Sequence, residues 1–359
     1  MRDASTWRTI AEIVRAAEQR LPAQVWDYSR GGAETEMTLR RNRLALDSLA
    51  FRPRVLRDVS LRTVGTTFLG IPLTLPVMLG PVGSVALFDP DGALACARAA
   101  EEAGTAAFIG SLASPNLEDV SRGTDAPLFF QLYITGERRQ THDLVTRAVA
   151  AGYRGICLTV DSAVYGRRER DIVNGFRPLD RDKPNLRTAP THHDRRPAAS
   201  YRAAVTWDDV DWLRQTTSLP VMIKGIMCAE DALLAVAHGV DVVYVSNHGG
   251  RQLDHGSATI DVLPEVVQAV SGRAAVLVDS GFTRGTDVLK ALALGADGVV
   301  LGKLMTWGLA AGGVRALVRV LDLLRQEMDV AMANIGVTCV AELSPEHLRP
   351  ARPVSVDQV

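Results

Sequence analysis

Residues 242–254 read Val-Val-Tyr-Val-Ser-Asn-His-Gly-Gly-Arg-Gln-Leu-Asp, and the rest of the chain is best interpreted outward from them. The first four residues form an apolar run that predicts a buried strand. The polar part that follows contains a histidine, an arginine and two adjacent glycines. A histidine can accept a proton near neutral pH, an arginine can hold a carboxylate through two parallel hydrogen bonds, and glycines allow close approach to a ligand. We therefore expect a strand that ends at a functional site.

An apolar strand followed by a helix recurs through most of the chain. Strands are predicted at residues 75–79, 106–109, 128–132, 155–160, 221–223, 242–246, 275–278 and 299–301, and a long helical region at 305–333 closes the series. The strands are apolar without alternation, which indicates burial on both faces, as in a parallel sheet. Eight such units predict a (β/α)8 barrel, the TIM barrel, within residues 75–333. A doubly wound open sheet is the alternative, and the absence of a glycine-rich dinucleotide fingerprint after the early strands counts against it.

The segments outside the barrel are interpreted as parts of one domain of residues 1–359. Residues 1–74 are expected to supply an N-terminal helical extension and a cap over one end of the barrel. Residues 169–205 form a long polar insert after the fourth strand, which predicts a mobile loop. His192 and His193 lie in this insert. A charged, solvated loop is the preferred interpretation there, and no metal site is predicted.

Composition narrows the possible partners and location. The formal net charge is -1, so nothing in the bulk charge favours nucleic acid or an anionic membrane. The N-terminus lacks the apolar core of a signal peptide, and no apolar run stands out as a bilayer span. Four cysteines are scattered singly, which favours reduced thiols in a cytoplasmic protein over disulfides. They are Cys96, Cys157, Cys228 and Cys339.

Polar groups follow nearly every predicted strand. In a barrel the C-terminal ends of the strands meet at one face, where active sites lie. The groups are Pro81 to Gly83 after the first strand, Gln131 and Tyr133 after the third, Thr159 and Asp161 after the fourth, Lys224 after the fifth, Ser246 and His248 after the sixth, Asp279 to Gly281 after the seventh, and Gly302 and Lys303 after the eighth. Any one of them could be a core or capping residue. Together they predict a site for one ligand.

The chemistry of these side chains suggests their roles. His248 would act as a base, and Asp161 would hold its imidazole and favour the charged form after proton transfer. Arg168 and Arg251 would clamp a substrate carboxylate. Lys224 could stabilise negative charge on an electron-accepting ring. A phosphate would lie beside the glycines that follow the last two strands, Gly281, Gly285 and Gly302. A cofactor with a phosphate tail and an electron-accepting ring is implied.

Residues 246–254 resemble the signature of the FMN-dependent 2-hydroxy acid oxidases and dehydrogenases, a family that includes glycolate oxidase, lactate oxidase and mandelate dehydrogenase. The resemblance covers nearly the whole chain, from Leu21-Pro22 to Leu343-Ser344-Pro345. Its other motifs are Phe129-Phe130-Gln131-Leu132-Tyr133, Leu158-Thr159-Val160-Asp161, Gly166-Arg167-Arg168 and Asp279-Ser280-Gly281. It implies an FMN barrel that oxidises an (S)-2-hydroxy acid to the 2-oxo acid, with electrons passing to oxygen or to a separate carrier.

The resemblance also assigns residues by position. His248 is similar to the catalytic base and Asp161 to its partner, and Lys224 stands at a catalytic position beside the flavin. The substrate positions are Tyr28, Tyr133, Arg168 and Arg251, of which Tyr28 follows from the resemblance alone. The FMN positions are Pro81, Val82, Gly83, Gln131, Thr159, Lys224, Ser246, Asp279, Ser280, Gly281, Thr283, Gly302 and Lys303.

The chain departs from the family pattern at two FMN positions. Thr283 and Lys303 stand where the family usually has arginines. Lysine keeps the charge but loses the bidentate geometry, and threonine keeps only a hydroxyl. Arg284 is a candidate to compensate. We expect weaker FMN retention than in typical relatives.

Within the family, the resemblance leans toward mandelate dehydrogenase and hydroxymandelate oxidase. Gly83, where many relatives carry alanine, leaves room beside the flavin. We therefore expect a bulky or aromatic substrate side chain, a protein without a membrane-binding insert and, by analogy, a homotetramer. The alternatives are a tailored oxidase of a biosynthetic pathway that acts on a different substrate, and a flavin-depleted, non-catalytic barrel.

Overall fold

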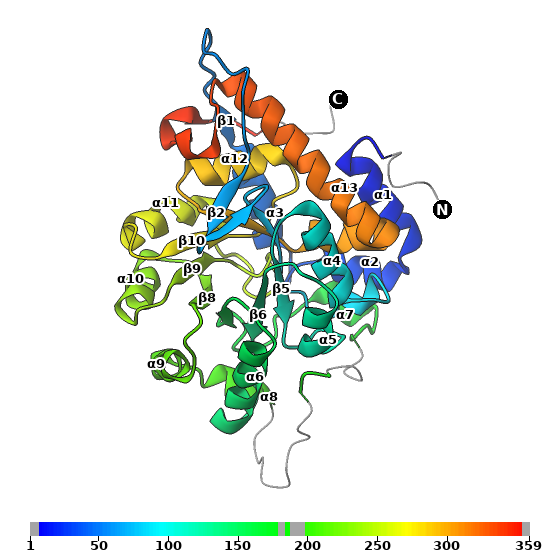
Figure 1. The fold of residues 1–359 in the computed structure, drawn as a ribbon. Coiled ribbons are helices and arrows are strands. Elements are labelled where there is room, and N and C mark those ends of the chain that lie inside the picture. The colour runs from blue at the N-terminus through cyan, green and yellow to red at the C-terminus, as the bar shows by residue number, and fades with distance from the viewer. Residues whose placement is uncertain (1–6, 179–183, 187–197, 354–359) are drawn as a thin grey trace.

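The computed structural model describes residues 7–178, 184–186 and 198–353. Their centre is a closed barrel of parallel strands (Figure 1). In barrel order the strands are β4 (Val77–Leu79), β5 (Ala107–Gly110), β6 (Leu128–Leu132), β7 (Ile156–Thr159), β8 (Val221–Ile226), β9 (Val242–Val245), β10 (Ala275–Val278) and β11 (Gly298–Leu301), and β11 pairs with β4 to close the ring. The predicted (β/α)8 barrel is confirmed, and the open-sheet alternative is wrong.

Helices surround the barrel and extend it at the N-terminus. The barrel helices are α4 (Ala93–Ala103), α5 (Leu117–Arg122), α6 (Arg138–Ala150), α9 (Trp207–Thr216), α10 (Ala229–Ala237), α11 (Thr259–Val270), α12 (Gly285–Ala293) and α13 (Lys303–Ile335). The N-terminal extension contains α1 (Ile10–Arg20), α2 (Ala23–Arg30) and α3 (Met37–Asp47). Figure 1 shows α1 packed along α13. The alternation of barrel strands and helices is the predicted one.

The interior of the barrel is apolar, and every strand contributes to it. The inward side chains are Met78, Phe108, Phe129, Cys157, Met222, Tyr244, Leu277 and Val300. Side chains along a strand alternate between faces with a period of two, so the residue two positions later also points inward. Those next residues are Gly80, Gly110, Gln131, Thr159, Lys224, Ser246, Asp279 and Gly302. Six of the residues predicted at the strand ends, Gln131, Thr159, Lys224, Ser246, Asp279 and Gly302, therefore belong to the upper, inward layer of the barrel.

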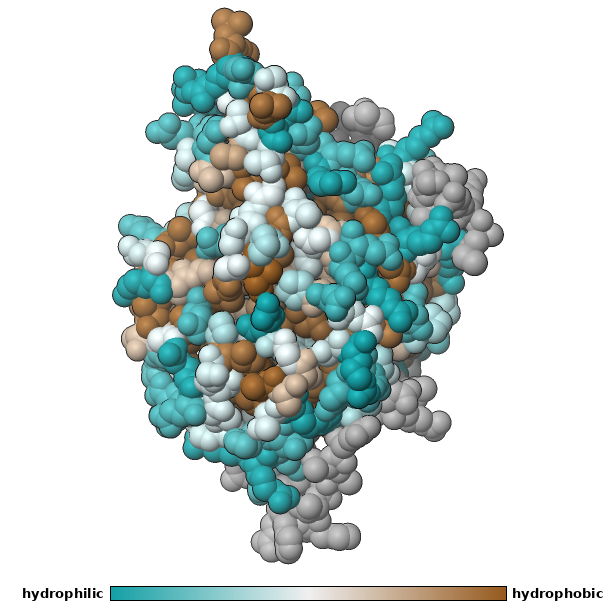
Figure 2. All heavy atoms as spheres, in the orientation of Figure 1, coloured by the Kyte–Doolittle hydropathy of each residue, from teal (hydrophilic) through white to brown (hydrophobic). Residues whose placement is uncertain are grey.

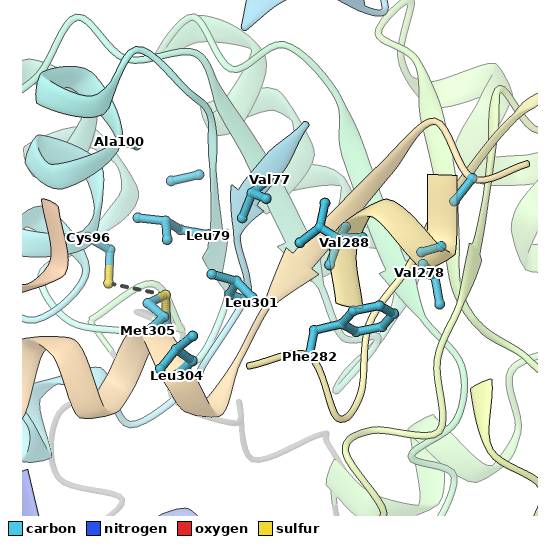
Figure 3. Packing of buried hydrophobic residues seen from close by; sticks show 14 of the residues in the cluster. Val77, Leu79, Cys96, Ala100, Val278, Phe282, Val288, Leu301, Leu304 and Met305 are labelled. Atoms are coloured by element: carbon cyan, nitrogen blue, oxygen red, sulfur yellow. Dashed lines mark hydrogen bonds between the residues drawn. The ribbon is translucent and has the colours of Figure 1, made fainter. Parts of the chain in front are cut away.

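The alternate strand residues face outward and pack against the helices (Figure 3). Val77 and Leu79 of β4 and Leu301 of β11 lie in this layer, with Met305 of α13 beside them. The Met305 sulfur is 3.7 Å from the Cys96 Sγ of α4. All four cysteines are free, as expected.

The N-terminal end of the barrel is covered by a hairpin of β2 (Thr66–Phe68) and β3 (Ile71–Leu73). Phe68 contacts Phe129 edge to face, with ring centroids 5.8 Å apart, inside the inner apolar cluster. A second small sheet pairs β1 (Leu49–Phe51) with β12 (Leu348–Pro350). Among the described residues, the β2–β3 hairpin therefore closes one end of the barrel, and the polar strand ends lie at the other.

The described parts of the insert at 169–205 form short helices and contacts with the rest of the protein. The insert contains α7 (Glu169–Val173) and α8 (Ala198–Ala203). Arg170 of α7 bonds Glu36 at 2.6 Å and Asp27 at 3.1 Å, contacts to the N-terminal extension that sequence patterns do not reveal. Asn185 is buried and accepts a hydrogen bond from the Leu117 amide. His192 and His193 lie outside the described residues.

Helix α13 requires one correction to the sequence interpretation. Among the described residues it is one helix long and apolar enough to cross a membrane by length and composition. It is interrupted at Gly312 and Gly313, whose backbone angles are non-helical, and Trp7 of the N-terminal extension lies against Gly312. More than half of its most apolar window is buried inside the protein. These are features of a barrel helix that packs in a core.

Candidate active site

His248 and Asp161 form a hydrogen-bonded pair at the C-terminal end of the barrel. The His248 Nδ1 lies 2.8 Å from the Asp161 Oδ1. His248 follows β9 in a left-handed turn, and its amide donates to the Ser246 Oγ at 3.1 Å. Asp161 follows β7 and packs against Gly225, where an added Cβ would come within 2.8 Å of it. The glycine at an irregularity of β8 therefore permits the pair to form.

The surroundings set the charges of this pair. Burial lowers the pKa of His248 below its ordinary value, although the Asp161 carboxylate opposes this shift. Burial works to raise the pKa of Asp161, but His248 and Lys224 outweigh it and hold that pKa well below its usual range. At neutral pH the pair is therefore an ionised aspartate beside a neutral imidazole. Since Asp161 accepts at Nδ1, the Nε2 is the basic nitrogen.

Lys224 is a buried cation between two carboxylates. Its Nζ donates to the Ser246 Oγ at 2.7 Å and lies 3.6 Å from the Asp161 Oδ2 and 3.5 Å from the Asp279 Oδ2. Burial works to lower its pKa, but the two carboxylates raise it above the ordinary lysine value. Lys224 therefore stays protonated in a site that excludes water.

The neighbouring inward residues are joined by short hydrogen bonds. Gln131 donates from Nε2 to the Thr159 Oγ1 at 2.9 Å. Ser280 donates to Asp279 at 2.7 Å and accepts from the Gly249 amide at 2.9 Å. These bonds link β6 to β7, and β10 to the turn after β9. The polar layer predicted from the strand ends is thus continuous from β6 to β10.

Two arginines and Tyr28 lie beside this layer. The Arg251 guanidinium lies 4.8 Å from the Tyr28 ring centroid, and its Nη1 donates to the Tyr28 carbonyl at 2.5 Å. Arg168 is buried and bonds the Tyr165 hydroxyl, the Gln252 Oε1 and the Arg251 carbonyl. Burial lowers the pKa of Arg168, and the Arg251 charge lowers it further. The two guanidinium charges are near enough to repel each other, so an anion beside them would be stabilised.

Tyr133 and Gly83 complete the surroundings of the site. Burial raises the pKa of the Tyr133 phenol, as does the nearby Asp161 carboxylate, so this hydroxyl keeps its proton. Pro81, Val82 and Gly83 follow β4 and are partly exposed. A Cβ added at Gly83 would lie 3.2 Å from the Leu112 Cβ. An alanine at this position would therefore crowd Leu112.

The side chains expected to bind a phosphate contact other protein groups in the structure. Arg284 is ion-paired with Glu327 of α13 at 2.7 Å, so its side chain does not replace the arginine missing at 283. The Thr283 hydroxyl instead accepts from Arg43 of α3 at 3.2 Å. Lys303 donates from Nζ to the carbonyls of Arg30 at 2.7 Å and Gly31 at 2.9 Å.

Sequence reasoning missed two residues that contact the predicted site. Tyr165 bonds Arg168 through its hydroxyl and lies under its guanidinium, 4.1 Å from ring centroid to Cζ. It lies between the motifs at 158–161 and 166–168, so proximity to them could have found it. No sequence pattern indicates Arg43, because it lies far from Thr283 along the chain.

Comparison with known proteins agrees with the fold and with the motifs. The model of the family described as FMN-dependent dehydrogenase matches residues 17–350. Glycolate oxidase 1 of Zea mays is 42% identical over 94% of this chain and 95% of its own length. L-lactate oxidase of a Nostoc species is also 42% identical, over 94% of this chain and 96% of its own.

The similarity to this family also holds for the three-dimensional structure. A soluble mutant of the membrane-associated (S)-mandelate dehydrogenase of Pseudomonas putida superposes with a TM-score of 0.89 at 37% identity, covering 95% of this chain and 99% of its own. The family match spans most of the chain, and the relatives share both sequence and barrel. The chain therefore belongs to the FMN-dependent dehydrogenase family, and it is an FMN-dependent oxidoreductase of small 2-hydroxy acids.

Proposed function

We propose that this enzyme oxidises (S)-2-hydroxy acids with a bulky, aromatic side chain, such as (S)-mandelate, to their 2-oxo acids. The observation that carries the substrate preference is the tight packing at Gly83. A Cβ added there would lie 3.2 Å from the Leu112 Cβ, so we infer that alanine would displace this loop into the substrate space and that glycine keeps the space clear. The similarity to a mandelate dehydrogenase supports the same choice, while the similarity to glycolate and lactate oxidases makes small acids the alternative.

The residues at the barrel mouth fit FMN. An added Cβ at Gly302 would meet nothing within 4 Å, so there is open space where α13 begins. The N-terminus of a long helix is a suitable place for a phosphate group. Gln131, Thr159 and Ser246 offer hydrogen-bonding groups to a flavin ring, and Lys224 offers a buried positive charge. When bound, FMN supplies the ring that accepts two electrons from the substrate.

His248 is proposed to accept the proton that the substrate loses. A general base must be unprotonated and within hydrogen-bond reach of that proton. The neutral imidazole presents Nε2, while Asp161 fixes the ring through Nδ1 and stabilises the positive charge that forms on it.

Arg251 is proposed to bind the substrate carboxylate, with Tyr28 and Tyr133 beside it. Its Nη1 is occupied by the carbonyls of Tyr28 and Gly31, which orients the remaining donors. Arg168 adds positive charge to the same region and, through its bond to the Arg251 carbonyl, holds the turn that carries Arg251. A carboxylate held by a fixed guanidinium places the adjacent carbon reproducibly.

The substrate preference is tested by turnover of matched acids. We expect a higher kcat/KM for (S)-mandelate than for glycolate or (S)-lactate. Gly83→Ala should lower kcat/KM for (S)-mandelate by about 10–200-fold, the range for one methylene too many in a pocket, and should affect glycolate far less. A wild-type preference for glycolate, or a Gly83→Ala variant that slows both acids equally, would contradict the proposal.

A further inference from the structure

The first turn of α13 holds the last turn of α2. Lys303 opens α13, and its Nζ donates to the carbonyls of Arg30 and Gly31. Trp307 follows four residues later, on the same face of the helix. Its Nε1 donates to the Ser29 Oγ at 3.1 Å, and its ring lies 5.5 Å from that of Trp26. One face of α13 therefore contacts α2 through both an amino group and an aromatic ring.

Arg251 contacts the same turn. Its Nη1 donates to the carbonyls of Tyr28 and Gly31, so the Gly31 oxygen accepts from both Arg251 and Lys303. The last carbonyls of a helix have no partner within the helix and carry its negative end, which favours cations there. The Lys303 side chain also runs beside the turn after β9, since a Cβ at Gly249 would lie 3.7 Å from its Cε.

The geometry assigns Lys303 and Trp307 a role as positioning residues for the substrate site. They fix the last turn of α2, which carries Tyr28, against Arg251. This differs from the role in phosphate binding that the family pattern implies for position 303. The carbonyls of Arg30 and Gly31 occupy two N–H donors of the Lys303 amino group. The inference deepens the proposed function and rests on it, because Tyr28 and Arg251 are its carboxylate site.

The test separates substrate positioning from flavin binding. Lys303→Met keeps the length of the side chain but removes its donors, and Trp307→Phe keeps a ring but removes the bond to Ser29. Val330→Ala, at an exposed position of the same helix, is the matched control. Two quantities are measured for each protein. They are the Kd for FMN, from quenching of flavin fluorescence by the apoprotein, and kcat and KM at saturating FMN.

We expect Lys303→Met to lower kcat/KM by about tenfold to a hundredfold, mainly through KM, because a small displacement of a binding group has that effect. The Kd for FMN should not change. Trp307→Phe should act in the same direction and more weakly, and Val330→Ala should change neither quantity. A weaker FMN affinity with normal kinetics at saturating FMN would overturn the inference, as would no change in either. Lys303→Met could change both the Kd for FMN and kcat/KM, and Trp307→Phe then decides. The inference is supported if Trp307→Phe changes only kcat/KM, and it is overturned if Trp307→Phe changes neither quantity.

The acid used is the one that the wild type turns over best among (S)-mandelate, (S)-lactate and glycolate. If that acid is lactate or glycolate, the proposed aromatic preference fails. The role of Lys303 is still decided, since all three acids carry the carboxylate.

Discussion

His248 should act as a base only while its imidazole is neutral, which gives the enzyme a defined pH dependence. Burial lowers the pKa of His248 below the ordinary value of about 6.5. kcat/KM should therefore be constant near neutral pH and fall as the pH drops through this lowered pKa. Asp161→Asn removes the anion that raises the His248 pKa, so the acid limb should move to still lower pH while the maximal rate falls. Profiles of kcat/KM against pH check this, and an acid limb above about 6.5 would refute it.

Thr283 gives a second prediction at the residue scale, on flavin affinity. Arg284 is engaged with Glu327, and Arg43 is engaged with Asp287 at 2.6 Å, so neither replaces an arginine at 283. Thr283→Arg should therefore tighten FMN binding by about 1.5 kcal/mol, roughly tenfold, the contribution of one hydrogen bond to a charged group. The Kd measured by fluorescence titration checks this. An unchanged Kd would mean that the phosphate is held without this position.

The contacts of individual side chains were predictable to different degrees. The inward polar residues, such as Gln131 and Lys224, could be predicted because they stand two positions after an inward apolar residue in the same strand. The contacts of Lys303 and Thr283 could not, because their partners come from α2 and α3, more than 200 residues away in sequence. Local patterns indicate which face a side chain occupies but not which distant group it meets.

At the scale of elements, the β2–β3 hairpin is expected to be a main source of stability. Phe68 is 2% exposed and packs on Phe129 across the bottom of the barrel. Phe68→Ala should reduce the free energy of unfolding by about 3–5 kcal/mol through lost burial and a cavity. Val330→Ala, at a side chain of α13 that is 61% exposed, should change it little. Urea denaturation followed by circular dichroism measures both, and equal effects of the two substitutions would be inconsistent with the hairpin acting as a packed cap.

The secondary-structure elements differ in how well the sequence predicts them. The barrel strands could be predicted because burial on both faces makes them continuous apolar runs. Helix α7 was missed because its sequence, Glu-Arg-Asp-Ile-Val, is short and polar. It is held by the ion pairs of Arg170 with Glu36 and Asp27, which come from the distant N-terminal extension.

For the whole molecule, we expect the homotetramer that the family resemblance implies. The loop that follows β1 projects from the body of the protein and carries hydrophobic surface at its tip (Figure 2). Val55 is 80% exposed there, and the Leu56 side chain is fully exposed. Exposed apolar surface of this kind is typical of a protein–protein contact. Light scattering coupled to size-exclusion chromatography should give the mass of four chains, and the mass of one chain would refute the expectation.

The central claim is that this protein reduces bound FMN with electrons from a 2-hydroxy acid, and that His248 takes the proton. The most direct measurement is the visible flavin spectrum of the purified holoenzyme during anaerobic addition of (S)-mandelate. We expect rapid bleaching of the oxidised flavin bands. His248→Gln should bleach about 10²–10⁴-fold more slowly, the usual contribution of a general base, while keeping its FMN.

Admission of air then distinguishes the electron acceptor, since rapid return of colour indicates oxygen and slow return indicates a carrier. A yellow protein that (S)-mandelate, (S)-lactate and glycolate all fail to bleach would contradict the claim.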